Sequence, residues 1–100
     1  MTKYELSLLL YFENCAVDYG GRVNALRMNA DDMAIAARWR KESFVSFGRI
    51  IIKDHNRDGT HWVELSEEAW AAAHAERRAR ARRMAEARSY TRTKEKAVHA

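Results

Sequence analysis

The polar stretch from Asp54 to Gly59 holds the side chains whose spacing most resembles a metal site. Asp54, Asn56, Asp58 and Gly59 match the opening of a calcium-binding EF-hand loop. Such a loop needs a glutamate at its twelfth position, because two further carboxylate oxygens complete the coordination shell. That position is Leu65 here, and turn-forming residues account for the same letters. We therefore expect no metal and no cofactor.

The residues capable of acid–base or nucleophilic chemistry are scattered along the chain. No histidine pairs with a cysteine or another histidine at a zinc-ligand spacing, and no nucleophile has an adjacent base. The four histidines are His55, His61, His74 and His99. The lone Cys15 cannot form an intramolecular disulfide, which fits a reducing compartment and a buried position on a helix. We expect a cytoplasmic protein that is not an enzyme.

The strongest chemical feature is positive charge near the C-terminus. The net charge is +4, but residues 1–76 hold nine Lys/Arg and twelve Asp/Glu. Residues 77–100 hold two acids, Glu86 and Glu95, and nine bases: Arg77, Arg78, Arg80, Arg82, Arg83, Arg88, Arg92, Lys94 and Lys96. Basic clusters attract polyanions, above all nucleic acid. The alternative is a solvated helix face that keeps an alanine-rich segment soluble.

The composition predicts one folded domain. One hundred residues that are 47% hydrophobic can bury a single core. The apolar run near the N-terminus is too short for a bilayer span and lacks a signal-peptide cleavage site before Glu13. We therefore interpret this run as core and expect no membrane association.

Residues 4–18 are predicted to form a first helix. The polar residues lie on one narrow stripe, at spacings of four, seven and four: Lys3, Ser7, Asn14 and Asp18. A helix that is apolar around most of its circumference is buried on more than one side, and a second copy of the chain could supply the second side. A buried strand over residues 6–12 is the alternative. Gly20 and Gly21 then provide a left-handed helix end and a turn.

A second helix is predicted from Asn29, its N-cap, to about Glu42. Asp31 and Asp32 lie in the positive first turn. The inward face is formed by Ile35, Ala36 and Trp39, and the outward face by Asp31, Ala34, Arg38 and Lys41. Residues 22–28 are compatible with a short helix or an extended segment.

The remaining chain predicts a hairpin and a last helix. Two β-branched and aromatic runs, 44–52 and 60–65, flank a tip over residues 54–59 that contains Asp-Gly. Ser66 then caps a helix to about Arg88, with Trp70 facing inward. Residues 89–100 are expected to be a frayed or disordered tail. The predicted fold is mainly α with a small β-hairpin, in one domain over residues 1–88 whose basic helix spans residues 66–88.

The order of these elements resembles a winged helix-turn-helix, most closely the MarR-type regulators. The resemblance rests on three segments: Lys41-Glu42-Ser43-Phe44-Val45, the hairpin tip from residue 54 to 59, and the second strand with the start of the last helix, from Val63 to Ala69. Ser43 stands where the family has a glycine at the end of its recognition helix. The resemblance covers about residues 29–70 and implies a winged helix-turn-helix with a long C-terminal helix.

The resemblance also implies roles for particular residues. Residues of the second helix would face the major groove of duplex DNA: Ala34, Arg38 and Lys41. Residues of the hairpin would contact phosphates or the minor groove: Arg49, Lys53 and Arg57. On the last helix, Arg77 and Arg78 would add salt-sensitive affinity. MarR-like proteins dimerise through terminal helices, which implies a homodimer interface that includes Leu6, Leu9, Leu10 and Trp70.

We therefore expect a homodimeric DNA-binding protein of the transcription-regulator type. The alternative is a small protein-interaction module, an inhibitor or adaptor of the kind found in phages and mobile elements. Such a module would use the same scaffold to dock on an acidic protein partner or on RNA. The two readings differ in the salt dependence of duplex DNA binding, because only a protein with several phosphate contacts loses affinity steeply as salt rises.

Overall fold

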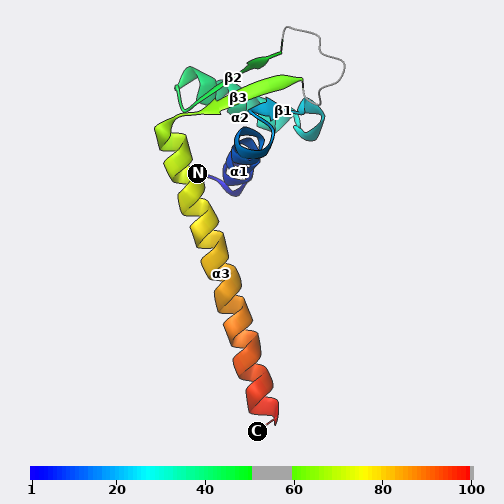
Figure 1. The fold of residues 1–100 in the computed structure, drawn as a ribbon, viewed down its shortest axis with the longest axis vertical. Coiled ribbons are helices and arrows are strands. Elements are labelled where there is room, and N and C mark those ends of the chain that lie inside the picture. The colour runs from blue at the N-terminus through cyan, green and yellow to red at the C-terminus, as the bar shows by residue number, and fades with distance from the viewer. Residues whose placement is uncertain (51–59, 100) are drawn as a thin grey trace.

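The computed structural model of the chain describes residues 1–50 and 60–99, with side chains as far as Ser89. Its described part is mainly helical with a small antiparallel sheet, as the sequence predicts (Figure 1). The elements in chain order are α1 (Lys3–Asp18), β1 (Arg22–Val23), the 3-10 helix η1 (Ala25–Arg27), α2 (Ala30–Lys41), β2 (Val45–Arg49), β3 (His61–Leu65) and α3 (Glu67–His99). The strand order in the sheet is β1–β3–β2.

Helix α1 begins and ends where its local sequence requires. The Thr2 side chain accepts a hydrogen bond from the Glu5 N–H, and the Glu5 carboxylate accepts one from the Thr2 N–H. This capping box satisfies two amides of the first turn. At the other end, Gly20 has φ +61° and Gly21 has φ +87°, which are conformations that side chains other than glycine rarely adopt. The alternative of a strand over residues 6–12 is therefore excluded.

Phe12 on α1 occupies the centre of the core. Its ring lies edge-on to Trp39 of α2, with centroids 6.2 Å apart, and stacks on Phe47 of β2 at 5.6 Å. Val23 and Val63 add fully buried side chains from the other two strands. The sheet therefore rests with one face on α1 and α2, and its other face is exposed.

The apolar circumference of α1 is buried within a single chain. Leu9 and Phe12 have no exposed surface, and Leu8, Leu10 and Cys15 are also buried. Helix α1 contacts β3 and β1 on one side, and α2 and α3 on others. The predicted polar stripe from Lys3 to Asp18 is exposed, and so are the apolar side chains of Tyr4 and Val17 near the two ends of the helix. A second copy of the chain is therefore not needed to bury the middle of this helix.

Residues 22–28 combine both structures that the sequence allows. Arg22 and Val23 pair with β3, and Asn24 then caps η1 by accepting a hydrogen bond from the Leu26 N–H. The pairing requires glycine just before it. A Cβ at Gly21 would lie 2.8 Å from the Val63 carbonyl oxygen, so any side chain there would force β1 and β3 apart.

Helix α2 has the predicted cap and the predicted faces. The Asn29 side chain accepts a hydrogen bond from the Asp32 N–H at 2.8 Å, and the Asp32 carboxylate accepts one from the Asn29 N–H at 3.2 Å. Ala36 and Trp39 are buried and Ile35 is half-buried. Ser43, just after the helix, has φ +61°. Ser43, which stands where the resemblance expects a glycine, therefore has a left-handed backbone conformation.

The predicted hairpin is present as β2 and β3, which pair antiparallel from Val45↔Leu65 to Arg49↔His61. Buried and exposed residues alternate along both strands, because one face covers the core and the other faces solvent. On the exposed face, the Trp62 side chain lies over Gly48. The predicted tip over residues 54–59 lies outside the described residues.

Helix α3 is longer than the sequence suggests. The Ser66 hydroxyl caps it by accepting a hydrogen bond from the Ala69 N–H at 3.1 Å, as predicted. The helix then continues past Arg88 to His99, where we expected a frayed or disordered tail. Residues 89–99 contain neither glycine nor proline, so nothing in the local sequence stops the helix.

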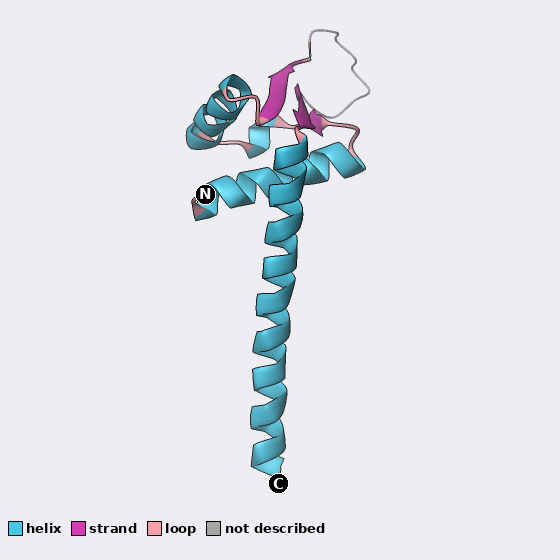
Figure 2. Ribbon diagram, turned by 90° about the vertical axis from the view of Figure 1, so that its left-hand side faces the viewer, coloured by secondary structure: helices cyan, strands magenta, loops and turns pink. Residues whose placement is uncertain are grey.

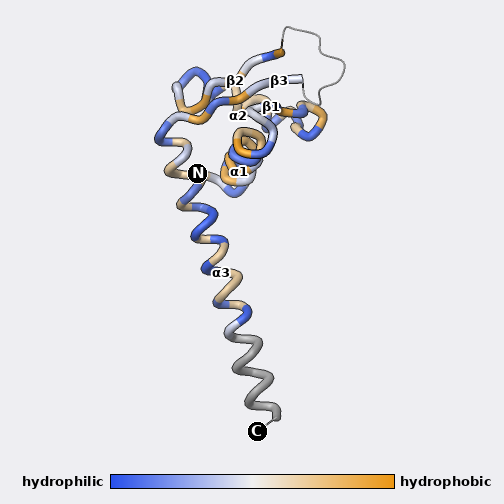
Figure 3. Tube along the Cα trace, in the orientation of Figure 1, coloured by the Kyte–Doolittle hydropathy of each residue, from blue (hydrophilic) through white to orange (hydrophobic). Residues whose placement is uncertain are grey.

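Most of α3 projects away from the rest of the molecule. It crosses α1 near its own start and then runs on alone (Figure 2), so the molecule measures 64 × 32 × 24 Å. Hydrophobic residues gather in α1 and the strands, whereas the coloured part of α3 alternates between hydrophilic and apolar positions (Figure 3). Within residues 1–50 and 60–99, no helix combines the length and apolar character needed to cross a membrane.

Candidate nucleic-acid interface

The outward face of α2 is lined by small side chains and ends in positive charge. Ala34 and Lys41 are exposed, as predicted, and Ala37 lies between them and is also exposed. Residues spaced by three and four share one side of a helix. Asp31 is exposed at the N-terminal end of this face, so the face changes from negative to positive along its length.

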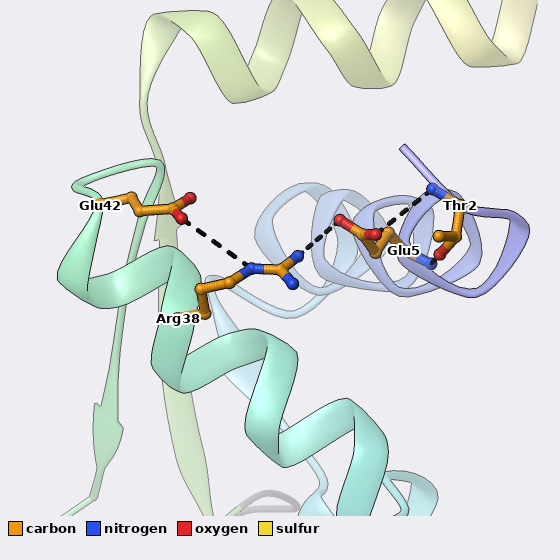
Figure 4. Close-up of polar contacts among 4 residues, drawn as sticks. All are labelled: Thr2, Glu5, Arg38 and Glu42. Carbon is orange, nitrogen blue, oxygen red and sulfur yellow. Dashed lines mark hydrogen bonds and ion pairs between the residues drawn. The ribbon is translucent and has the colours of Figure 1, made fainter.

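Arg38 borders this face but is bound to the chain's own carboxylates. Its Nη2 donates to Glu5 Oε2 on α1 at 2.6 Å, and its Nε lies 4.0 Å from Glu42 Oε1 (Figure 4). The hydrogen bond from the Thr2 backbone N–H is the main cause that lowers the pKa of Glu5, and the Arg38 charge lowers it further. Glu5 is therefore ionised at neutral pH and holds Arg38 in place.

The surroundings of Arg38 are acidic as well. An open cleft of about 650 Å³ lies beside it, where the starts of α1 and α3 meet the end of α2. The carboxylates of Glu5, Glu42 and Glu68 line this cleft. A phosphate approaching from that side meets three negative charges for one guanidinium, and like charges repel. The ion pairs and the acidic surroundings disfavour the predicted contact of Arg38 with the major groove, which stays a prediction.

Arg40 is a cation that the sequence reasoning did not select. It is exposed on the other side of the same face, and like Lys41 it makes no ion pair with any residue that the structure describes. Its position could have been found from the helical period, because Arg40 lies three residues after Ala37. The free cations of α2 are thus at its C-terminal end.

The hairpin carries one of its three predicted cations within the described residues. Arg49 is exposed at the end of β2 and pairs with His61 across the strands. Burial lowers the pKa of His61, and the nearby Arg49 charge lowers it further, so His61 is neutral at pH 7. Lys53 and Arg57 lie outside the described residues.

The start of α3 is tied to α1 through a buried carboxylate. Glu13 is 4% exposed, and its Oε1 accepts a hydrogen bond from the Arg77 Nε. His74 Nε2 lies 3.8 Å from Glu13 Oε2, and Arg77 Nη2 also donates to the Asn14 side chain at 3.3 Å. Arg77 therefore joins two helices and neutralises a buried charge. This pairing disfavours its predicted role as a DNA contact, which stays a prediction.

The other arginines of α3 fall into two groups. Arg80 and Arg83 both donate to Glu76 Oε1 at 3.0 Å. Arg78, whose role in DNA binding was predicted, is exposed and makes no ion pair with a described residue, and Arg82 and Arg88 share both properties. Since α3 leads away from the sheet and α2 packs on it (Figure 1), the free cations of α2 and those of α3 lie on two separate surfaces.

The predicted dimer residues divide between core and surface. Leu9 and Leu10 are buried in a single chain at 0% and 9% exposure, because α1 is enclosed by the other elements. This corrects their assignment to a dimer interface. Leu6 and Trp70 are half-buried. Trp70 lines a groove of about 280 Å³ beside Ala16 and Leu65.

The described residues hold no group of three histidine, cysteine or carboxylate side chains that could bind a metal. The arrangement offers two cationic surfaces and a groove, which suit binding. Compared with protein-family models, curated proteins and solved structures, the chain gives no significant match.

Proposed function

We propose that this chain is a DNA-binding protein of the winged helix-turn-helix type, similar in layout to the MarR-like regulators. The observation that carries the proposal is the outward face of α2. It presents exposed Ala34 and Ala37 next to free Arg40 and Lys41, on the helix that directly precedes the hairpin. Small side chains let a helix approach base edges closely, and arginine or lysine can bind guanine in the major groove.

The layout around α2 supports the same reading. The hairpin follows α2 directly, and Arg49 lies at the end of β2 next to the connection to β3. In the proposed complex the C-terminal half of α2 enters the major groove, because Asp31 makes the N-terminal half negative. Arg49 contacts phosphate and positions the protein without reading sequence. Arg38 acts through Glu5 as a positioning residue that fixes α2 on α1.

Many regulators of this type act as homodimers, and the groove beside Trp70 is where we place a second copy. The exposed side chains of Val17 and Tyr19 belong to the end of α1, next to Ala16 and Gly20 in the groove wall. Burial of such apolar surface favours association. A half-buried tryptophan is also a common anchor at interfaces.

A protein-interaction module remains the second candidate, and one observation favours it. Arg38, Arg77, Arg80 and Arg83 are all engaged by carboxylates of the same chain. This pairing reduces the positive charge that is free to meet phosphate. An inhibitor or adaptor would use the same rigid body without needing those cations.

The test is selection of bound sequences from a pool of random duplex DNA. The intact chain is expected to enrich one motif. The Arg40→Ala/Lys41→Ala variant is expected to lose the motif and to bind the selected duplex at least tenfold more weakly, because each lost base contact costs about 1–3 kcal/mol. Arg80→Ala/Arg83→Ala is the matched control, since it removes the same charge from α3. No enrichment by the intact chain, even at low salt, would favour the protein-interaction module.

A further inference from the structure

Two of the arginines of α3 without a described ion pair, Arg78 and Arg82, lie on the side of the helix that faces away from the body. Ala69 and Ala73 are fully buried against the core. Arg78 follows Ala69 by nine residues, and Arg82 follows Ala73 by nine. Nine residues are two and a half turns of an α-helix, so both arginines lie opposite the buried alanines. Their exposure agrees with this placement.

The arginines on the body side are used differently. Arg77 lies four residues after Ala73 and binds buried Glu13, and Arg80 lies four residues after Glu76 and binds it. Arg83 joins the same carboxylate. Arg77, Arg80 and Arg83 therefore form an inner set that neutralises the chain's own acids, whereas Arg78 and Arg82 form an outer pair that does not.

Repulsion between Arg78 and Arg82 destabilises α3 in the isolated chain. Arg78 and Arg82 are spaced i, i+4, and like charges at that spacing destabilise a helix. All residues from Arg80 to Ser89 are exposed, so this part of α3 gains nothing from packing, although most helices depend on packing for their stability. A ligand that brings negative charge to the outer face removes the repulsion.

We infer that the outer face of α3, centred on Arg78 and Arg82, is a second contact surface for the phosphate backbone of duplex DNA. The inference rests on the proposed function, because it assigns a further part of the same protein to the same ligand. Charge complementarity carries it. Arg78 and Arg82 are both exposed on the same side of α3, and neither makes an ion pair with a residue that the structure describes.

Phosphate contacts of this kind add affinity for every sequence equally and make binding sensitive to salt. The surface of α2 selects sequence, whereas that of α3 does not. The two contributions can therefore be separated by measuring the motif and the salt dependence independently.

The experiment measures binding of the full chain to a labelled 30-base-pair duplex of arbitrary sequence by fluorescence anisotropy at several salt concentrations. For Arg78→Ala/Arg82→Ala we expect the slope of log affinity against log salt to become shallower by about 2, since each phosphate contact contributes about 0.9. The motif selected from random DNA is expected to stay the same. Arg80→Ala/Arg83→Ala is the control of equal charge and is expected to keep the wild-type slope.

The outcomes separate this inference from the proposed function. An unchanged slope for Arg78→Ala/Arg82→Ala, with the motif still selected, overturns the DNA contact of α3 but not the proposed function. An acidic protein surface would then be the alternative ligand for the outer face of α3. An equal loss of slope in the Arg80→Ala/Arg83→Ala control also overturns it, because total charge then explains the effect. Salt-dependent binding through Arg78 and Arg82 without any selected motif supports the α3 contact and rejects sequence reading by α2. Absence of duplex binding by the intact chain rejects both.

Discussion

Arg38 on α2 donates a hydrogen bond to Glu5 on α1 at 2.6 Å, between residues 33 positions apart in the chain. If Arg38 fixes α2 in place, Glu5→Gln and Arg38→Ala should weaken DNA binding by similar small factors and leave the selected motif unchanged. A lost guanine contact would instead lower affinity about 5- to 150-fold. Titration of both variants with the selected duplex distinguishes these cases. A changed motif in Arg38→Ala alone would restore Arg38 as a base-reading residue.

The ion pairs of Glu76 predict a dependence of stability on acid. Hydrogen bonds from Arg80, then from Arg83, lower the pKa of Glu76. A carboxylate with a lowered folded-state pKa stabilises the fold above its ordinary value, about 4.3, and this contribution is lost as pH falls through the folded value. Urea midpoints measured from pH 7 to pH 3 should therefore fall less for Glu76→Gln than for the wild type. Glu64→Gln, which removes an exposed carboxylate without a described ion pair, is the control and should fall like the wild type.

The buried carboxylate of Glu13 predicts an asymmetric response to mutation. Arg77→Ala leaves this charge without its main partner and should cost about 3 kcal/mol of unfolding free energy. Glu13→Leu/Arg77→Leu removes both charges and should recover most of that loss. Urea unfolding followed by tryptophan fluorescence measures both, with Arg78→Ala as the exposed neighbouring control. A loss in the double variant as large as in Arg77→Ala would show that the pair itself stabilises the fold.

The two glycines after α1 should respond differently to alanine. Gly20 has open space around it, so Gly20→Ala should cost only the penalty of a left-handed residue, about 1–2 kcal/mol. Gly21→Ala adds a contact of 2.8 Å with the Val63 carbonyl oxygen and should cost clearly more, because β1 must separate from β3. Urea midpoints of the two variants provide the comparison. Equal midpoints would mean that the strands adjust without loss.

The exposed part of α3 should contribute little to the stability of the body. The last residue of α3 that belongs to the hydrophobic core is Ala73. Among the residues that the structure describes, Arg83 is the last one on α3 that forms an ion pair. A chain ending at Arg83 should therefore keep the urea midpoint of the full chain while losing helical circular dichroism. A lower midpoint would reveal a stabilising role for residues 84–100.

Local features were predicted well because neighbouring residues determine them. The caps at Asn29 and Ser66 depend on a side chain three residues from the amide that it binds, and the structure confirms both. The faces of α2 and the presence of a hairpin follow from the periods of helix and strand and from the turn residues between the two strand runs.

Pairings between distant residues could not be predicted in this way. Glu13 stands among apolar residues of α1, and nothing in its neighbourhood indicates a partner 64 positions away. The same holds for Arg38 and Glu5, so the sequence could not indicate that two arginines assigned to DNA bind carboxylates of the same chain. Burial of α1 on several sides also has two explanations, a second chain or other elements of the same chain. The sequence pattern is identical for both, and three-dimensional packing decides between them.

Helix α3 is attached to α1 near its own start, through Glu13 and Arg77, and most of its length extends beyond this attachment. From residue 78 to residue 99 it extends about 33 Å, at about 1.5 Å per residue. A swing of about 10° at the attachment displaces the far end by roughly 6 Å, as geometry requires of an arm that long. The contacts that fix the start of α3, namely the Glu13–Arg77 pair and the buried Ala69 and Ala73, therefore determine the direction in which the rest of the helix extends.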